Sequence, residues 1–420
     1  MKRFLSAVLA ALLLFSLCAC GQTAPVEEDV PQITEISLWV YPMRWLEQEA
    51  FAGFLAGYEA KNPHTHITVT YLEEDTADAT VRGAIETGMV PDLLLGNTKP
   101  LVTQFSRDGM MADLTGICDG RGIYDHVLSA CTGKDGKVYL APLFINVYCM
   151  AFNQYLFEDA DVLEYADVEN HCWNSSDFFD AEIEMFDYGT TDFASLYCSG
   201  QNGDYGTRAF VTSLYDGGLV DENGSYALTN DKNLRALKKL VRYKGFRWDD
   251  TMLAEDAAYL FARGEYAASL CWNVDMMREY SPSFPVIPMA FPTEDGSIAG
   301  LPGEIWGLSV FDNRDADRLS AAYSFVNYFY NFDEAYRELL KLSGYFSART
   351  DFTLYADDPV MAPYEALSAY ITPEPRGTDN WVQMRTAWCE MLSGIANTDD
   401  IGESGIREAM EAFDMAANSQ

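Results

Sequence analysis

Apolar and polar residues recur along this chain with two periods, one typical of β-strands and the other of α-helices. In the stretch HITVTYL every second residue is apolar, which predicts a strand. Before it, apolar residues from Leu46 to Tyr58 recur at helical spacing, and Asn62-Pro63 predicts the end of that helix. The resulting βαβαβ order predicts a parallel sheet flanked by helices. Strands are expected at 36–41, 66–72 and 91–96, and helices at 46–58 and 79–88.

The later half of the chain is dominated by helical periodicity, with short strand-like pieces between the helices. Two further strands, 136–143 and 147–153, precede this region. Helices are expected at 233–243, 257–264, 320–330, 335–342, 380–392 and 405–416, and strands at 265–272, 284–291 and 305–311.

The N-terminal segment has the layout of a secretory signal. Lys2 and Arg3 precede an apolar run from Phe4 to Leu17, which is too short for a comfortable membrane span of about 20 residues. The stretch Leu17-Cys18-Ala19-Cys20 resembles the bacterial lipobox, in which the cysteine becomes the lipid-bearing N-terminus. We therefore expect a signal peptide at 1–19, a lipidated Cys20 and a flexible linker at 20–32, with the protein on the outer side of the cell membrane; a plain signal peptide is the alternative.

The charge of the chain excludes some partners. Its 420 residues include 28 Lys and Arg against 64 Asp and Glu, a formal net charge of -36. Nucleic acid requires a basic surface, so it is not expected as a partner. Electrostatic attachment to anionic lipid is equally unfavourable, and the lipid on Cys20 must supply the anchor.

The cysteines favour reduced, buried thiols. Seven remain after Cys18 and Cys20, an odd number that cannot pair completely. Several lie inside apolar runs, where cysteine behaves as a small hydrophobic residue. Cys118 and Cys131 both lie in loop-like sequence and form the one pair for which a disulfide is considered.

Motifs of enzymes and metal sites are missing. The four histidines form no His-Glu-x-x-His motif, and no Gly-x-Ser-x-Gly elbow occurs. His64 and His66 lack a third ligand nearby, so they are interpreted as loop residues. With 64 acidic residues, no pair is singled out as a glycosidase dyad. We expect no catalytic residue, metal or cofactor.

Several stretches, taken in order, resemble the extracellular solute-binding proteins of ABC importers, and most of all the sugar-binding group that includes maltose-binding protein. The strongest single similarity is NWVQMRTAW at 380–388, where the family has a cleft tryptophan followed by Arg-Thr-Ala. The resemblance covers residues 33 to 415. The other stretches are FAGFLAGYEAKNPHTHITVTYL, VPDLLLG, DGKVYLAPLFINVYCMAFNQYLF, YLFARGEYAASLCW and SGYFSART.

The resemblance implies an α/β fold of the type II periplasmic-binding-protein class, with two lobes and a ligand cleft between them. Each lobe is expected to hold a mainly parallel sheet flanked by helices. The chain is expected to cross between the lobes near 143–148 and near 286–291. The first lobe would comprise 33–145 and 290–342, and the second 146–289 and 343–418.

The same resemblance, applied residue by residue, implies a substrate-binding cleft assembled from several loops. Aromatic rings suit the apolar faces of sugars, while amides and carboxylates bond to their hydroxyls. The expected cleft residues are Tyr41, Arg44, Trp45, Asn97, Lys99, Asn146, Trp272, Asn273, Asp275, Glu304, Trp306 and Trp381.

Departures from the family pattern put maltose itself in doubt as the ligand. Pro42-Met43-Arg44 replaces an acidic-basic pair, Asn146 stands at the hinge glutamate position, and Trp272 lies two residues before the family's tryptophan. The expected function is capture of a small solute, a sugar or oligosaccharide, by a monomer that delivers it to the permease subunits of an ABC transporter. The alternatives are a surface-anchored carbohydrate-active enzyme and a ligand sensor with the same fold.

Overall fold

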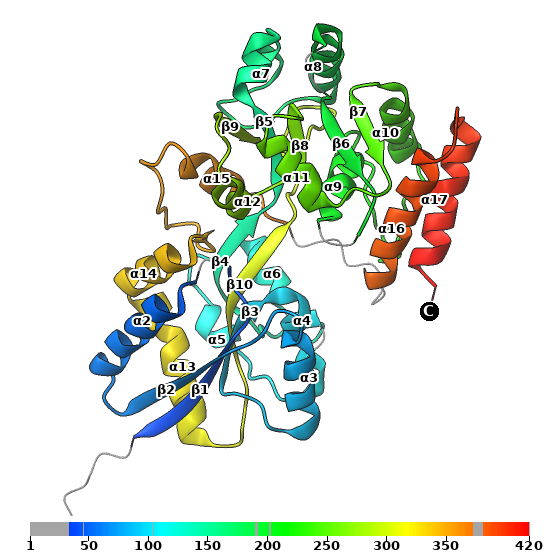
Figure 1. Ribbon diagram of the computed structural model, residues 1–420. Helices are drawn as coiled ribbons and strands as arrows, with labels where there is room; N and C mark the ends of the chain where they lie inside the picture. The colour runs from blue at the N-terminus through cyan, green and yellow to red at the C-terminus, as the bar shows by residue number, and fades with distance from the viewer. Residues whose placement is uncertain are drawn as a thin grey trace, which may run out of the picture.

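Two groups of β-strands, each covered by helices, divide the protein into two lobes (Figure 1). The computed structural model describes residues 33–44, 46–103, 105–189, 192–200, 203–372 and 381–419, and of residues 99, 100 and 103 it describes only the backbone. Within these ranges, every helix is too short or too polar to span a lipid bilayer.

The first lobe contains a six-stranded sheet whose order is β11-β4-β10-β3-β1-β2. Strand β1 lies between β2 and β3 and pairs with both in parallel, as the βαβαβ pattern predicted. The apolar residues of β1 at every second position, Ile36, Leu38 and Val40, are buried, which explains why the alternation identified it. The strands are β1 (Thr34–Val40), β2 (Thr65–Tyr71), β3 (Leu93–Asn97), β4 (Ala141–Val147), β10 (Gly303–Val310) and β11 (Phe346–Ser347).

The prediction of a mainly parallel sheet needs one correction. Strand β10 lies between β3 and β4 and is antiparallel to both, so β4 runs in the same direction as β3. The edge strand β11 is also antiparallel to β4. The reason is topological: β4 leads the chain out of this lobe, whereas β10 brings it back, and the two therefore run in opposite directions.

Helices cover both faces of this sheet. On one face α2, α13 and α14 pack together, and Phe54 of α2 stacks on Phe329 of α13 with ring centroids 5.7 Å apart. Helices α3 and α4 lie on the opposite side in Figure 1. The helical elements of this lobe are α2 (Gln48–Lys61), α3 (Ala77–Thr87), α4 (Thr98–Thr103), η1 (Phe105–Asp108), α5 (Thr115–Cys118), α6 (Asp125–Ala130), α13 (Ala316–Asn331) and α14 (Asp333–Ser343).

The second lobe has a three-stranded sheet of order β8-β5-β9 and a parallel pair, β6-β7. A parallel bridge between Asp192 and Tyr266 joins β6 to β8, so the two groups are neighbours. Only β5 runs against its neighbours β8 and β9, and it is the strand by which the chain enters the lobe. The strands are β5 (Cys149–Asn153), β6 (Ala194–Tyr197), β7 (Phe246–Asp249), β8 (Ala268–Trp272) and β9 (Val286–Met289).

Aromatic residues form much of the core of the second lobe. Phe178 makes edge contacts with Trp173, Phe193 and Phe210, with ring centroids 4.7–5.4 Å apart. Its helical elements are α7 (Gln154–Asp159), η2 (Leu163–Tyr165), α8 (Ser175–Tyr188), α9 (Tyr205–Ser213), α10 (Asp231–Arg242), α11 (Ala254–Ala262), α12 (Val274–Tyr280), α15 (Met361–Ser368), α16 (Trp381–Ala396) and α17 (Glu403–Ala417).

Separate segments connect the lobes. The chain passes from β4 to β5 at Tyr148, whose backbone N–H donates to the carbonyl of Pro302 at 2.8 Å. It returns between β9 and β10, in residues 290–302, just after the range expected for the second crossing. Leu301 in this return segment bridges to Ile371, which follows α15, so the connecting segments support one another. They form a hinge region below the cleft.

The seven described cysteines all carry free thiols. The disulfide considered for Cys118 and Cys131 is therefore absent, and both side chains are buried. Burial raises the pKa of the Cys118 thiol to about 12, which keeps it protonated and unreactive. Five of the seven, all but Cys172 and Cys389, are buried and pack as small hydrophobic residues, as the apolar context of most of them predicted.

A buried carboxyl group on α8 makes stability depend on pH. Glu182 is 1% exposed and accepts the N–H of Gly245 at 2.7 Å, an approach that a side chain at position 245 would block. Burial raises the pKa of Glu182 from its usual 4.5 to about 7. Between these two values the unfolded chain binds fewer protons than the folded one, so the free energy of unfolding falls as pH rises from 4.5 to 7.

We expect Glu182→Gln to abolish the fall in the free energy of unfolding between pH 4.5 and 7. The variant should be more stable than the original protein at pH 8, by about 2 kcal/mol, and should differ little from it at pH 4.5. Urea unfolding at the two pH values measures the effect, with Glu184→Gln on the exposed face of α8 as the control. Equal pH dependence in the Glu182 variant and the original protein would contradict the assignment.

Candidate functional site

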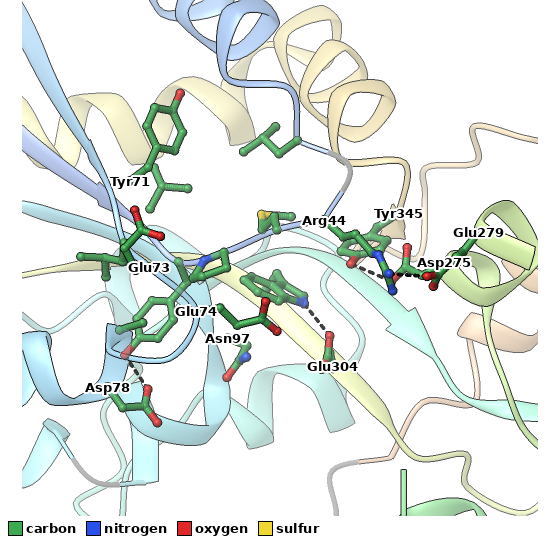
Figure 2. Close-up of a pocket in the computed structure, with 18 of the residues that line it drawn as sticks. Arg44, Tyr71, Glu73, Glu74, Asp78, Asn97, Asp275, Glu279, Glu304 and Tyr345 are labelled. Carbon is green, nitrogen blue, oxygen red and sulfur yellow. Dashed lines mark hydrogen bonds and ion pairs between the residues drawn. The ribbon is translucent and has the colours of Figure 1, made fainter. Parts of the chain in front are cut away.

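A cavity of about 840 Å³ opens between the two lobes (Figure 2). The first lobe contributes the loops that follow β1 and β2, the end of β3 and the start of β10. The second lobe contributes the start of α11 and the helix α12, and Tyr345 and Trp381 complete the wall. Most of the contributing loops follow the carboxyl ends of parallel strands, which is where open α/β sheets commonly bind ligands.

The loop after β1 places Tyr41 at the cavity wall. Its hydroxyl donates to Asp78 at the start of α3, at 2.9 Å. Its ring packs on Gly96, where a Cβ atom would lie 2.8 Å from the ring, so the glycine makes room for it. Burial, reinforced by Asp78, raises the pKa of Tyr41 well above its usual value. Tyr41 therefore stays a neutral phenol and is 6% exposed at the cavity wall.

An ion pair spans the mouth of the cavity. Arg44 of the first lobe donates to Glu279 of α12 in the second lobe, with N and O 2.5 Å apart. Both side chains keep access to solvent, since Arg44 is 57% and Glu279 30% exposed. Such a pair contributes little to stability, but it links the two lobes directly. Figure 2 shows it at one end of the pocket.

Asp275 joins three parts of the structure at the floor of the cavity. Its Oδ2 accepts from the Asn146 side-chain amide and from the Tyr345 hydroxyl, each at 3.0 Å. Asn273 caps the N-terminus of α12 by accepting the N–H of Met276, and so fixes the turn that carries Asp275. Asn146 and Asn273 are buried and do not line the cavity themselves. Their role in the structure is to hold Asp275.

Strand β10 supplies Glu304 and Trp306. The Trp306 indole N–H donates to Glu304 Oε2 at 3.1 Å, which orients the carboxylate along the cavity wall. Trp306 is 5% exposed, and its ring centroid lies 6.4 Å from that of Tyr345. Asn97 at the end of β3 is its register partner across the sheet and also lines the cavity. The sheet thus presents two rings and two polar groups side by side.

Trp381 is the first residue of α16 and lines the cavity from the second lobe. The guanidinium of Arg385, one turn later, lies over its ring at 4.9 Å from the centroid. Arg385 in turn bonds to Asp204 Oδ1 at 3.0 Å, and the other oxygen of Asp204 is paired with Arg208. The ion pairs of Asp204 with Arg385 and Arg208 therefore hold in place the guanidinium group that packs on the Trp381 ring.

Trp272 does not reach the cavity, which corrects the sequence prediction. It is fully buried at the end of β8, where its indole N–H donates to the Tyr364 hydroxyl at 2.8 Å. Its ring packs edge-on against Phe261 at 5.0 Å. The side chain points into the core of the second lobe because the next residues turn into α12 and present Asp275 to the cavity instead.

Seven of the twelve predicted cavity residues line it, and three others are described and lie elsewhere. Asn146 and Asn273 lie beneath it and Trp272 in the core. Trp45, the side chain of Lys99 and the lipidation site Cys20 lie outside the described residues. The seven that line the cavity are Tyr41, Arg44, Asn97, Asp275, Glu304, Trp306 and Trp381.

Several lining residues were missed by the sequence analysis. Glu73 and Glu74 directly follow strand β2, and their place at the carboxyl end of a parallel strand was a usable signal. Tyr345 lies in the stretch SGYFSART, which carried part of the family resemblance. Glu255 and Tyr280 come from helices whose approach to the first lobe no local pattern reveals.

Comparison with known proteins agrees with this architecture. The family of bacterial extracellular solute-binding proteins matches residues 54–368. The chain belongs to this family. One curated relative is the maltooligosaccharide ABC transporter solute-binding lipoprotein of Streptococcus pneumoniae, which is 26% identical to this chain over 227 residues. That alignment spans 53% of this chain and 47% of the relative, about half the length of each.

Solved structures of other binding proteins share the two-lobed fold of this solute-binding protein. The cyclic alpha-maltosyl-1,6-maltose binding protein of Arthrobacter globiformis aligns with a TM-score of 0.76 at 19% identity, over 92% of this chain and 98% of that one. The sugar-binding protein MalE of Xanthomonas citri aligns with a TM-score of 0.74 at 13% identity, over 91% and 97%. At these identities the similarity establishes the fold.

Proposed function

We propose that this chain is a lipid-anchored extracellular solute-binding protein that captures a sugar or oligosaccharide and delivers it to an ABC transporter permease. The observation that carries the proposal is the cavity, which is lined by both lobes and combines aromatic rings with carboxylate and amide groups. Aromatic rings stack on the apolar faces of a sugar, and the polar groups accept hydrogen bonds from its hydroxyls. The sugar-related names of the Streptococcus and Arthrobacter relatives support the same ligand class.

The work of the protein in this proposal is binding followed by lobe closure. A ligand that touches Trp306 of the first lobe and Trp381 of the second binds the closed arrangement better than the open one, and so shifts the population toward it. The proposed moving units are residues 33–145 with 290–342, and 146–289 with 343–418, except that Asn146, Val147 and β11 move with the first lobe, in whose sheet they pair. Sheet pairing of the first lobe continues to Val147 and takes in β11. In this proposal the protein acts as a monomer, and it binds its ligand without catalysing a reaction.

Ligand binding is tested by the melting temperature of the purified protein in the presence of neutral oligosaccharides, amino acids and oligopeptides. A ligand at a hundredfold excess over its Kd raises stability by about 2.7 kcal/mol. We expect a shift with oligosaccharides only, and intact sugars after prolonged incubation. Shifts confined to peptides would overturn the ligand class, and cleavage products that disappear in cavity variants would favour the carbohydrate-active enzyme.

Membrane attachment is proposed to depend on Cys20. We expect Cys20→Ala to release the protein from the membrane fraction, because more than one acyl chain is needed for stable anchoring and this residue would carry them. Cys18→Ala, two residues away, is the matched control and should stay bound. Fractionation and mass spectrometry of the N-terminus measure both. Membrane-bound, acylated Cys20→Ala protein would show that the lipid lies elsewhere.

A further inference from the structure

The described residues that line the cavity carry an unusual excess of negative charge. Seven of the 23 are Asp or Glu, against 64 of 420 in the whole chain, which is about twice the proportion. The one cation among them is Arg44, and it is already paired with Glu279. The general acidity of the protein therefore does not account for the high proportion of acidic residues in the cavity lining. The seven acidic residues are Glu73, Glu74, Asp78, Glu255, Asp275, Glu279 and Glu304.

Among the internal positions whose side chains are not described, Lys99 and Arg376 are the cations and Glu374 and Asp379 the acids, so their formal charges cancel in the sequence.

The carboxylates fall into two groups by their hydrogen bonds. Asp78, Asp275 and Glu304 accept from side chains of the cavity wall, as described above. No described residue donates a hydrogen bond to the side chains of Glu73, Glu74 or Glu255, whose acceptors are open to the cavity and to solvent. Among the described residues no cation is paired with them, and a ligand that offers donors and a positive charge fits them.

A buried acceptor beneath the cavity floor is consistent with this need for donors. Asn146 is fully buried, and no described residue donates to its Oδ1. The side-chain N–H of Asn146 donates to Asp275, and the residue opposite Asn146 on β10 is Glu304. Asn146 therefore lies between two carboxylates that line the cavity. Buried polar atoms normally have a partner. The layer beneath the cavity thus adds one acceptor that no described residue satisfies.

The negative groups lie on both lobes and face the same space. Glu73, Glu74 and Asp78 lie on one side of the pocket in Figure 2, and Asp275 and Glu279 on the other. Burial together with Glu279 and Glu255 raises the pKa of Tyr280 to about 12, a sign of the local field. Like charges repel as the lobes approach, more strongly as water is expelled. A cation held between the lobes reverses that repulsion and favours closure.

We propose that the solute of this protein is a saccharide bearing a protonated amine, and that the cavity discriminates against saccharides bearing carboxylate or phosphate groups. The inference rests on the proposed function, since the rings of Trp306 and Trp381 hold the sugar ring while the carboxylates select its charge. A cation close to an aromatic face gains further attraction from the ring.

The test compares ligands with one skeleton and different charge. Calorimetry at pH 6 measures Kd for glucosamine oligosaccharides, for the same oligomers N-acetylated, and for oligogalacturonates. We expect the amine to bind at least tenfold more tightly than the amide, the uronate to show no binding, and the preference for the amine to shrink as salt increases. Equal or tighter binding of the N-acetylated or maltose-type oligomers would overturn this inference while leaving sugar binding intact. Absence of binding by every saccharide would overturn both proposals.

Variants locate the effect in the cavity. Glu73→Gln combined with Glu255→Gln should weaken binding of the glucosamine oligomer about tenfold and leave the N-acetylated one almost unchanged. Glu222→Gln, in an exposed turn far along the chain from the cavity residues, is the control for charge alone and should bind as the original protein does. Unaltered selectivity in the double variant would show that these carboxylates do not choose the ligand.

Discussion

Replacing Trp388 with alanine is expected to lower the free energy of unfolding by about 3–5 kcal/mol, the usual cost of deleting a large core aromatic. Trp388 is fully buried on α16, its indole N–H donates to Thr207 at 2.9 Å, and its ring packs edge-on against Phe413. Removal leaves a cavity between α9, α16 and α17 and takes away the hydrogen bond that the indole donates to the Thr207 hydroxyl. Chemical denaturation measures the loss.

Trp381, seven residues earlier on the same helix, is the matched comparison. It is half-buried at the cavity, so Trp381→Ala should cost much less stability. It should weaken ligand binding at least tenfold, equivalent to about 1.4 kcal/mol. The two variants thus separate stability from binding. A large stability loss in Trp381→Ala with unchanged affinity would place this ring in the core and contradict its proposed role.

The second large effect is expected for Asp204→Asn. Asp204 is buried between Arg208 and Arg385, and its neutralisation removes the carboxylate charge with which both guanidinium groups pair. Loss of one partner from a buried ion network typically costs 3–5 kcal/mol. Because Arg385 lies over the Trp381 ring, we also expect weaker ligand binding and a changed tryptophan emission spectrum. Denaturation, calorimetry and fluorescence measure these effects.

Asp216→Asn is the control for this substitution. Asp216 pairs with Lys232 at 3.2 Å, but its side chain is 91% exposed. Surface ion pairs of this kind contribute little, so no measurable change is expected. A similar loss of stability in Asp216→Asn and Asp204→Asn would show that burial of the Asp204 ion pairs does not determine how much they stabilise the protein.

Periodicity was sufficient for elements whose buried positions are mostly apolar. The helices α10, α13, α14 and α17 and the strands β1 and β2 were predicted from it and are confirmed. Helix α8 was missed because a core position is held by the carboxyl of Glu182, which interrupts the apolar stripe. Strands β6 and β7 have four residues each, too few for a period to be recognised.

The sequence alone determined the order of the strands and helices with clear periods, the acidity of the chain, and the family resemblance that pointed to a two-lobed binding protein. These depend on local periods, on composition and on short ordered motifs, all of which are read along the chain. Tertiary structure decided which side chains share the cavity. Trp272 ends strand β8 and Trp306 lies within strand β10, both among apolar residues, yet one lies in a core and the other at the cavity wall. That choice depends on how α12 and β10 meet across the hinge. The convergence of Glu73 and Glu74 with Glu255 and Glu279, about 180 to 200 residues apart, arises only when two separately folded lobes face each other.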